Sequence, residues 1–140
     1  MIKEGMAAQY TEISLEEMHT FLKRAFWALK PIKQGVARDR AGRGEIFFDL
    51  TLSRRVAVRV YSSVPEHSSM GQGLGQDAIR VGLFSAQGKP LQGGKLPIVK
   101  RTQGWRDSLK DKVEFFMERY EAAEDDLEAG RFVDWSKISV

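Results

Sequence analysis

Three segments near the middle of the chain alternate apolar and other side chains with a period of two. They cover residues 45–52, 56–61 and 79–84. Because successive side chains of a β-strand point to opposite faces of a sheet, the pattern predicts three strands whose aliphatic sides are buried together. The side chains expected on the buried face are Ile46, Phe48, Leu50, Leu52, Val56, Val58, Val60, Ile79, Val81 and Leu83.

The opposite face of these strands combines aromatic rings with guanidinium groups. A sheet face that only meets solvent is more usually polar. Rings that stack on bases, together with arginines that pair with phosphates, are what a single-stranded nucleic acid requires. The combination therefore predicts a surface that binds single-stranded DNA or RNA. Its members are Phe47, Arg59, Tyr61, Arg80 and Phe84.

Length and composition indicate one globular domain over residues 1–140. A chain of 140 residues with 42% hydrophobic and 29% charged residues has enough material for one ordinary core. No stretch reaches the apolar length that spans a bilayer, and the charged N-terminus lacks the apolar block of a signal peptide. The absence of cysteine excludes disulfides and thiolate metal sites, and it fits a reducing compartment. We therefore expect a cytoplasmic protein.

The net charge of +3 conceals an uneven distribution along the chain. Residues 23–106 contain 16 lysines and arginines and 5 acidic residues, a local charge of +11. The segments before and after them carry −3 and −5. A concentrated basic region is typical of proteins that bind a polyanion, although a solvated basic surface without a partner has the same composition.

Helical periodicity flanks the basic region on both sides. Apolar spacing predicts a helix over residues 14–30, with a capping box formed by Ser14 and Glu17. A longer helix is expected over residues 105–129, followed by a tail of residues 130–140. Aromatic and apolar side chains outside the core pattern of the first helix and in the tail favour a homo-oligomer. These side chains are Phe21, Trp27, Phe132, Trp135 and Ile138.

Between the helices we expect an antiparallel sheet of about four strands. The first two strands are joined too closely for any connection except a hairpin, and Pro97 argues that the last strand lies at an edge. The fold class is therefore α+β, with the sheet packed against an N-terminal helix and a long C-terminal helix. The expected strands are 45–53, 55–62, 77–86 and 95–102 with a short element at 89–92, and the expected loops are 33–44 and 62–76.

Further cations around the sheet are candidates for phosphate contacts. They lie in the basic loop, at the tip of the hairpin, and at the junction between the last strand and the long helix. At that junction Trp105 either stacks on a base or fixes the helix to the sheet. The additional candidates are Arg38, Arg40, Arg43, Arg54, Arg55, Lys100, Arg101, Trp105 and Arg106.

A metal-dependent nuclease is the enzymatic alternative. Such an enzyme needs clustered carboxylates, often with a lysine, to bind Mg²⁺ and position water. Pairing of Asp49 with Arg59 or Arg80 across strands is a simpler role for one of the available acids. The acids of the sheet region are Glu45, Asp49 and Asp77, and the lysines are Lys89 and Lys100.

No other motif in the sequence indicates a reaction. The glycines at 71–75 precede an expected strand, whereas a dinucleotide-binding fingerprint requires a helix after its glycines. The two histidines, His19 and His67, lack a clear carboxylate partner for a metal centre. We therefore expect no catalytic residue, cofactor or metal.

The expected order of helix, antiparallel strands and long helix is similar in topology to Whirly-type and Pur-type single-strand binders. It is also similar to the single-strand annealing proteins of DNA recombination and repair. No signature residue of these families occurs in the sequence, and no site residue is transferred from them. The sequence predicts a non-catalytic protein that binds single-stranded nucleic acid. A nuclease, or an assembly protein whose outer sheet face is a subunit interface, is the alternative.

Overall fold

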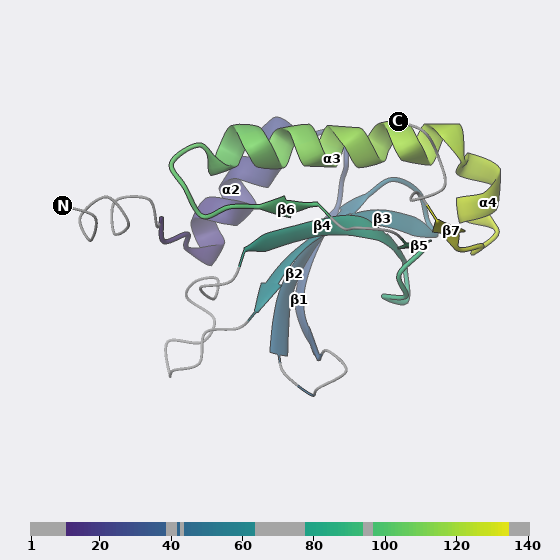
Figure 1. The fold of residues 1–140 in the computed structure, drawn as a ribbon, viewed down its shortest axis with the longest axis horizontal. Coiled ribbons are helices and arrows are strands. Elements are labelled where there is room, and N and C mark those ends of the chain that lie inside the picture. Colours follow the sequence, from purple (N-terminus) through teal and green to yellow (C-terminus); the bar gives the residue numbers. More distant parts are fainter. Residues whose placement is uncertain (1–10, 39–41, 43, 64–77, 94–96, 135–140) are drawn as a thin grey trace.

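A five-stranded antiparallel sheet carries two helices on one of its faces (Figure 1). The computed structural model describes residues 11–38, 42, 44–63, 78–93 and 97–134. This α+β arrangement confirms the expected fold class, although the sheet has one strand more than expected. In spatial order the strands are β1 (Ile32–Arg38), β2 (Gly44–Thr51), β3 (Val56–Ser63), β4 (Ile79–Ser85) and β6 (Ile98–Val99).

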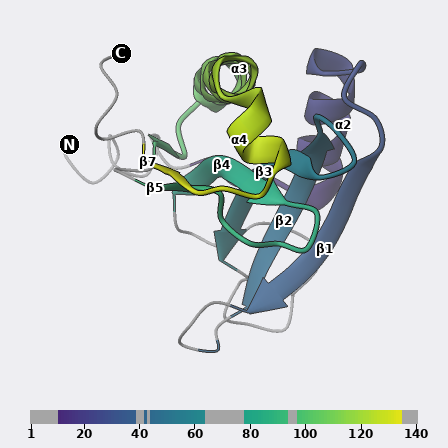
Figure 2. The same cartoon turned by 90° about the vertical axis from the view of Figure 1, so that its right-hand side faces the viewer.

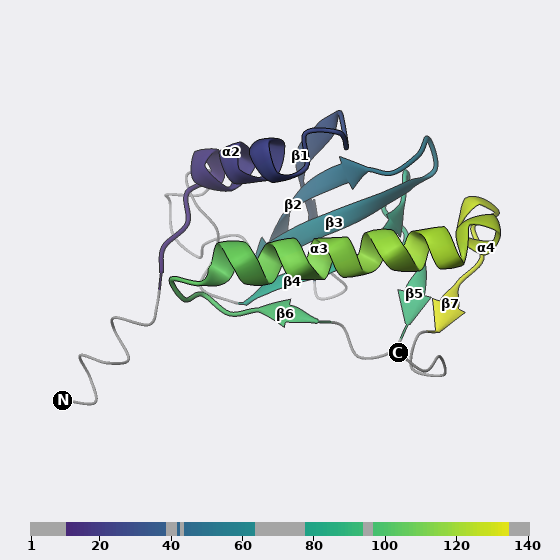
Figure 3. The same ribbon diagram turned by 90° about the horizontal axis from the view of Figure 1, so that it is seen from above.

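The two helices cover the aliphatic face of the sheet, and Figures 2 and 3 show both on the same side. The first helix, α2 (Leu15–Ala25), packs on β2, and α3 (Trp105–Ala122) crosses β3, β4 and β6. The predicted capping box starts α2: the hydroxyl of Ser14 accepts from the Glu17 N–H at 3.0 Å, and the Glu17 carboxylate accepts from the Ser14 N–H at 3.4 Å. The core between the layers includes Met18, Leu22, Ile46, Phe48, Leu50, Val58, Val60, Ile79, Val81, Leu83, Trp105, Leu109, Val113 and Phe116.

The hairpin of β2 and β3 confirms the antiparallel pairing expected from its short connection. Phe47 pairs with Tyr61 across the two strands, and Asp49 pairs with Arg59. One strand further, Tyr61 lies opposite Arg80 of β4. The register therefore brings the predicted aromatic and basic residues onto one face, opposite the helices.

Strand β1 corrects the prediction of a basic loop over residues 33–44. Residues 32–38 pair with β2 over their whole length, from Ile32 opposite Leu50 to Arg38 opposite Gly44. The strand lies at an edge and most of its side chains are exposed, so it carries little apolar alternation. Residues 39–41 and 43 of that segment lie outside the described residues, as do 64–77 of the predicted glycine- and serine-rich loop.

Both predicted helices are shorter than their apolar spacing indicated. The first ends at Ala25 instead of residue 30. The second is interrupted at Ala123, whose φ of −129° is not helical, and continues as the short helix α4 (Glu124–Glu128). Apolar spacing continues through the interruption as far as Leu127, so periodicity did not reveal it.

The segments that follow β4 differ most from the expected strands. The element expected at 89–92 is β5 (Gln92–Gly93), which pairs in parallel with β7 (Val133–Asp134) beyond α4. The last strand is reduced to β6, and it lies at the sheet edge as Pro97 predicted. Of the tail, residues 135–140 lie outside the described part. Within the described ranges, no helix is both long and apolar enough to cross a membrane.

Candidate nucleic-acid interface

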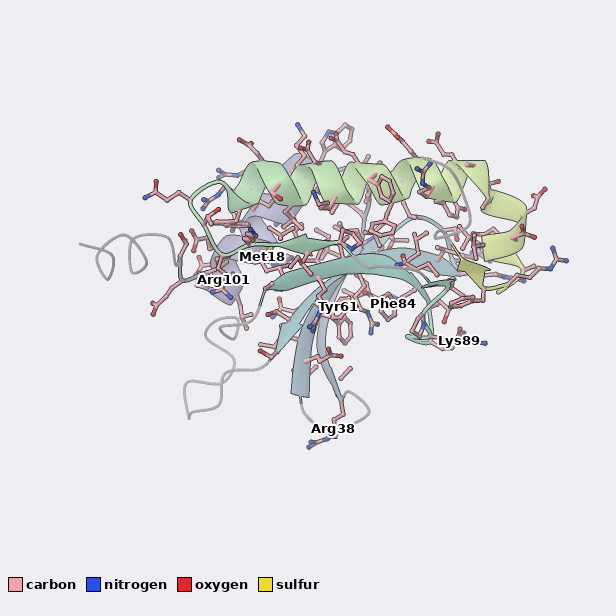
Figure 4. All side chains as sticks on the ribbon, in the orientation of Figure 1. Met18, Arg38, Tyr61, Phe84, Lys89 and Arg101 are labelled. Carbon is pink, nitrogen blue, oxygen red and sulfur yellow. The ribbon has the colours of Figure 1, made fainter. Side chains whose placement is uncertain are left out.

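The sheet face opposite α2 and α3, here called the open face, carries the five residues predicted to share a surface. No helix in the described part of the chain lies over it. Tyr61 and Phe84 project from the sheet away from α3 (Figure 4). Their burial differs: Arg59 and Tyr61 are each 8% exposed, Phe47 and Phe84 are half-buried, and Arg80 is exposed.

Arg59 lies at the centre of the open face and is already paired. Its Nε donates to Asp49 Oδ1 at 2.8 Å, and its Nη2 donates to Asp49 Oδ2 at 3.0 Å. The guanidinium carbon also lies 3.9 Å from the ring centroid of Phe47 and 4.6 Å from that of Phe84. The guanidinium therefore combines a bidentate ion pair along one edge with close contact to two aromatic rings. The cross-strand pairing of Asp49 with Arg59 that the sequence suggested is confirmed.

Two glycines from other segments lie against this cluster. A Cβ on Gly35 of β1 would lie 2.7 Å from Cζ of Phe47, so only glycine leaves room for the ring there. Gly88 has a φ of +84°, and a Cβ built on it would lie 3.4 Å from Nη2 of Arg59. The turn after β4 therefore folds back against the guanidinium group.

The same turn and β1 enclose a shallow open groove of about 640 Å³ over the ion pair. Lys33, which pairs with Asp49 in the β1–β2 register, is exposed and supplies a positive charge to the groove. The groove thus combines a neutralised ion pair at its floor with an exposed cation at its side. Its lining residues are Lys33, Gln34, Ala37, Phe47, Asp49, Arg59, Ala86, Gln87 and Gly88.

Tyr61 extends the aromatic cluster, because its ring contacts that of Phe84. The two rings meet edge to face, with centroids 5.4 Å apart. Burial raises the pKa of the Tyr61 phenol above its ordinary value of 10.0, and the nearby Glu45 carboxylate raises it further. Arg80 acts in the opposite direction. The phenol of Tyr61 is therefore neutral under ordinary conditions, and Arg80 supplies the exposed positive charge of this region.

The cations predicted at the periphery of the sheet have different surroundings. Arg38 is exposed at the end of β1 (Figure 4), where its Nη1 donates to the carbonyl oxygen of Gly42 at 2.8 Å. Arg54 and Arg55 are exposed at the tip of the β2–β3 hairpin, as predicted. Nη1 of Arg55 donates to the Glu128 carbonyl oxygen at 3.2 Å. Arg40 and Arg43 lie outside the described residues.

The predicted cluster at the start of α3 lies on the helical side of the molecule. Trp105 is fully buried against Phe21, with ring centroids 5.3 Å apart, so it fixes α3 to α2. Arg101 is 6% exposed, and its Nε donates to the Thr11 carbonyl oxygen at 3.0 Å. These two side chains are therefore parts of the packed interior.

The two remaining cations of that cluster reach the surface. Arg106 stacks on the Trp105 ring at 4.4 Å and pairs with Glu17 at 2.7 Å. Lys100 is exposed. Neither lies in the groove of the open face, so the structure separates this cluster from the sheet residues with which the sequence grouped it.

The carboxylates considered for a nuclease are not gathered into a cation site in the described part of the chain. No group of three or more His, Asp or Glu side chains within those ranges is arranged to hold a metal ion. Asp49 is engaged by Arg59, and Asp77 lies outside the described residues.

Sequence reasoning did not include Lys33, Gly35 or residues 86–88 in the site. Each depends on a contact distant along the chain: β1 must pair with β2, and the turn must fold back on Arg59. Gly35, between Gln34 and Val36, is the one signal in the sequence: a glycine within a strand often marks close approach of another group.

No protein-family model matches the sequence, and comparison with curated proteins and with solved structures gives no match.

Proposed function

We propose that the protein binds single-stranded DNA or RNA along the open face of its sheet, without catalysis. The observation that supports this most is the groove beside the Arg59 cluster. It is open to solvent, carries the exposed Lys33 and lies on the face that also presents Arg80. A polyanion that follows this face meets exposed positive charges at both sides of a half-buried aromatic cluster.

In this proposal the exposed cations bind phosphates, and the rings contribute apolar contact. The exposed parts of Phe47 and Phe84 meet bases or sugars, while their guanidinium-facing sides remain occupied by Arg59. Stacking on an accessible ring contributes about 1–3 kcal/mol per base, so part of that range is expected here. The cations assigned to phosphate contacts are exposed: they are Lys33, Arg38, Arg54, Arg80 and Lys89, the last of which follows Gly88 in the turn after β4.

A salt titration of oligonucleotide binding tests the proposal. Matched single- and double-stranded oligonucleotides are titrated in EDTA at several salt concentrations. The double variant Lys33→Ala with Arg80→Ala should bind more weakly, and its salt slope should fall by about 0.7 for each phosphate that is no longer neutralised. The charge-matched control is Lys23→Ala with Lys110→Ala, because both residues are exposed on the helices of the opposite layer.

Three results would count against this function. Equal affinity of the wild type and the Lys33/Arg80 variant would remove the open face as the site. Cleavage of the oligonucleotide on addition of Mg²⁺ or Mn²⁺ would favour the nuclease. Failure to bind either oligonucleotide, together with a defined oligomer, would favour an assembly protein.

We further propose a cytoplasmic homo-oligomer. The exposed side chains of Trp27 and Phe132 support self-association, at 69% and 59% exposure. The absence of cysteine supports a reducing compartment. Self-association is tested by sedimentation of the wild type and of Trp27→Ser. If the Trp27 ring lies in a subunit contact, the variant should sediment with a smaller mass than the wild type.

A further inference from the structure

The Asp49–Arg59 pair differs from the exposed cations of the open face in its burial and in its contacts. Only 10% of the Arg59 side chain and 9% of the Asp49 side chain are exposed. Two of the arginine's nitrogens are used by one carboxylate, and the rings of Phe47 and Phe84 lie close to the guanidinium group. The carboxylate occupies the Nε–Nη2 edge of the guanidinium, so a phosphate could meet only the remaining N–H groups of a side chain that is 10% exposed.

The contacts of the Asp49–Arg59 pair indicate a different role from phosphate binding, because they join several segments of the open face. Through them Arg59 joins Phe47 and Asp49 of β2 to Phe84 of β4, across its own strand β3. It also lies against Gly88 of the turn that forms one side of the groove. Phe47 in turn meets Gly35 of β1, which forms the other side. The guanidinium therefore lies at the point where both sides of the groove meet its floor.

We propose that Arg59 and Asp49 are positioning residues of the open face, which set the two rings and the 86–88 turn and do not bind phosphate themselves. The role rests on the proposed function, because the groove they shape is the site assigned to nucleic acid. Arginine is required rather than any cation, since lysine offers neither a bidentate fork nor a planar group that stacks on aromatic rings.

The test compares the same kind of substitution at Arg59 and at the exposed Arg80. Arg80→Lys should retain most affinity, and Arg80→Met should lower the salt slope by about 0.7, as expected for a phosphate contact. Arg59→Lys should instead lower affinity by about tenfold or more, the effect of disrupting a well-formed site, although its charge is kept. Its salt slope should remain that of the wild type.

A readout that needs no nucleic acid separates this inference from the proposed function. In amide NMR spectra the Gly88 signal should shift in Arg59→Lys and Asp49→Asn but not in Arg80→Lys. The apolar pair Arg59→Met with Asp49→Leu serves as a variant without buried charge, in case the single variants do not fold. It too should shift Gly88 and weaken binding without a change in salt slope.

Two outcomes would overturn the positioning role. One is wild-type affinity in Arg59→Lys with a reduced slope in the apolar double variant, which is the behaviour of a phosphate ligand. The other is an unshifted Gly88 signal in every variant of the pair. If the wild type binds no oligonucleotide while Gly88 shifts as described, the proposed function fails and the structural role of the pair is retained.

Discussion

At the scale of single residues, the contact between Gly35 and Phe47 shows how much the open face depends on one missing side chain. The Phe47 ring cannot simply move aside, because the Arg59 guanidinium lies 3.9 Å from its centroid. A methyl group on Gly35 would therefore press the ring toward the ion pair. The smallest residue of β1 thus helps to fix a bulky ring of β2.

Gly35→Ala should destabilise the protein by about 1–3 kcal/mol, the usual cost of overpacking. Combining it with Phe47→Leu should restore part of the loss, because the smaller side chain vacates the space. The free energy of unfolding in urea measures both effects. Phe47→Leu alone is the control, since it removes the ring without adding a methyl group to Gly35. Additive effects of Gly35→Ala and Phe47→Leu would contradict the contact.

Tyr61 should make stability depend on pH in the alkaline range. Burial raises the pKa of its phenol above 10.0, so the folded state holds the proton more tightly than the unfolded state. The stability that results is fully present below pH 10.0 and is lost as the pH rises through the higher folded pKa.

Ultraviolet titration of the phenolate and urea unfolding at a series of pH values check this expectation. Tyr61→Phe should remove one of the late-titrating groups and reduce the loss of stability above pH 10.0. Tyr120→Phe assigns the second raised pKa, which has burial as its main cause and the hydrogen bond to Glu128 as the next. An unchanged alkaline profile in Tyr61→Phe would be inconsistent with the buried phenol.

The sequence could predict which side chains of the candidate site share the open face. It could not predict how deeply each of them is buried. Alternation placed Phe47, Arg59 and Tyr61 on one side, and the strand register agrees. Whether each side chain is accessible depends on Gly35 and on the turn at Gly88, which come from other segments. Local periodicity has no information on such contacts.

At the scale of elements, α4 and the tip of the β2–β3 hairpin are joined by a cluster of hydrogen bonds. The Glu128 carboxylate accepts from the hydroxyl of Ser53 and, at 2.8 Å, from that of Tyr120. The Ser53 hydroxyl also accepts from the backbone N–H groups of Arg55 and Val56, both at 3.1 Å. One carboxylate thus connects the hairpin tip to α3 and α4.

Glu128→Ala should lower the free energy of unfolding by about 1–3 kcal/mol, because two hydroxyl donors are deprived of a charged acceptor. Glu124→Ala is the matched control on the same short helix, where the side chain is exposed. Urea unfolding of both variants gives the comparison. Equal stability of the two would show that the carboxylate contributes nothing beyond its exposed neighbour.

Elements with a strong local pattern could be predicted, and elements defined by distant partners could not. The capping box of Ser14 and the β2–β3 hairpin follow from neighbours in the sequence, and both occur. β1 has one neighbouring strand and lies at the sheet edge, so it lacks the alternation that marks a strand. The parallel pair of β5 and β7 joins residues about forty positions apart and leaves no periodic signal in segments this short.

At the scale of the whole molecule, the sheet is covered by helices on one face and has β3 at its centre. β3 pairs with neighbours on both edges, whereas β1 pairs only with β2. Amide hydrogens of Val58 and Val60 should therefore exchange only through global unfolding, and those of β1 through smaller openings. Native-state exchange at rising denaturant concentration measures this order. Equal exchange free energies in β1 and β3 would contradict it.

The rings, the ion pair and the turn of the open face contact one another directly within the folded chain. A surface that is preorganised in this way loses little conformational freedom when a ligand arrives. Under the proposed function, the ordering entropy of binding falls on the flexible nucleic acid strand. Association should then be a single fast step governed by charge steering, with a rate that decreases as salt screens the field.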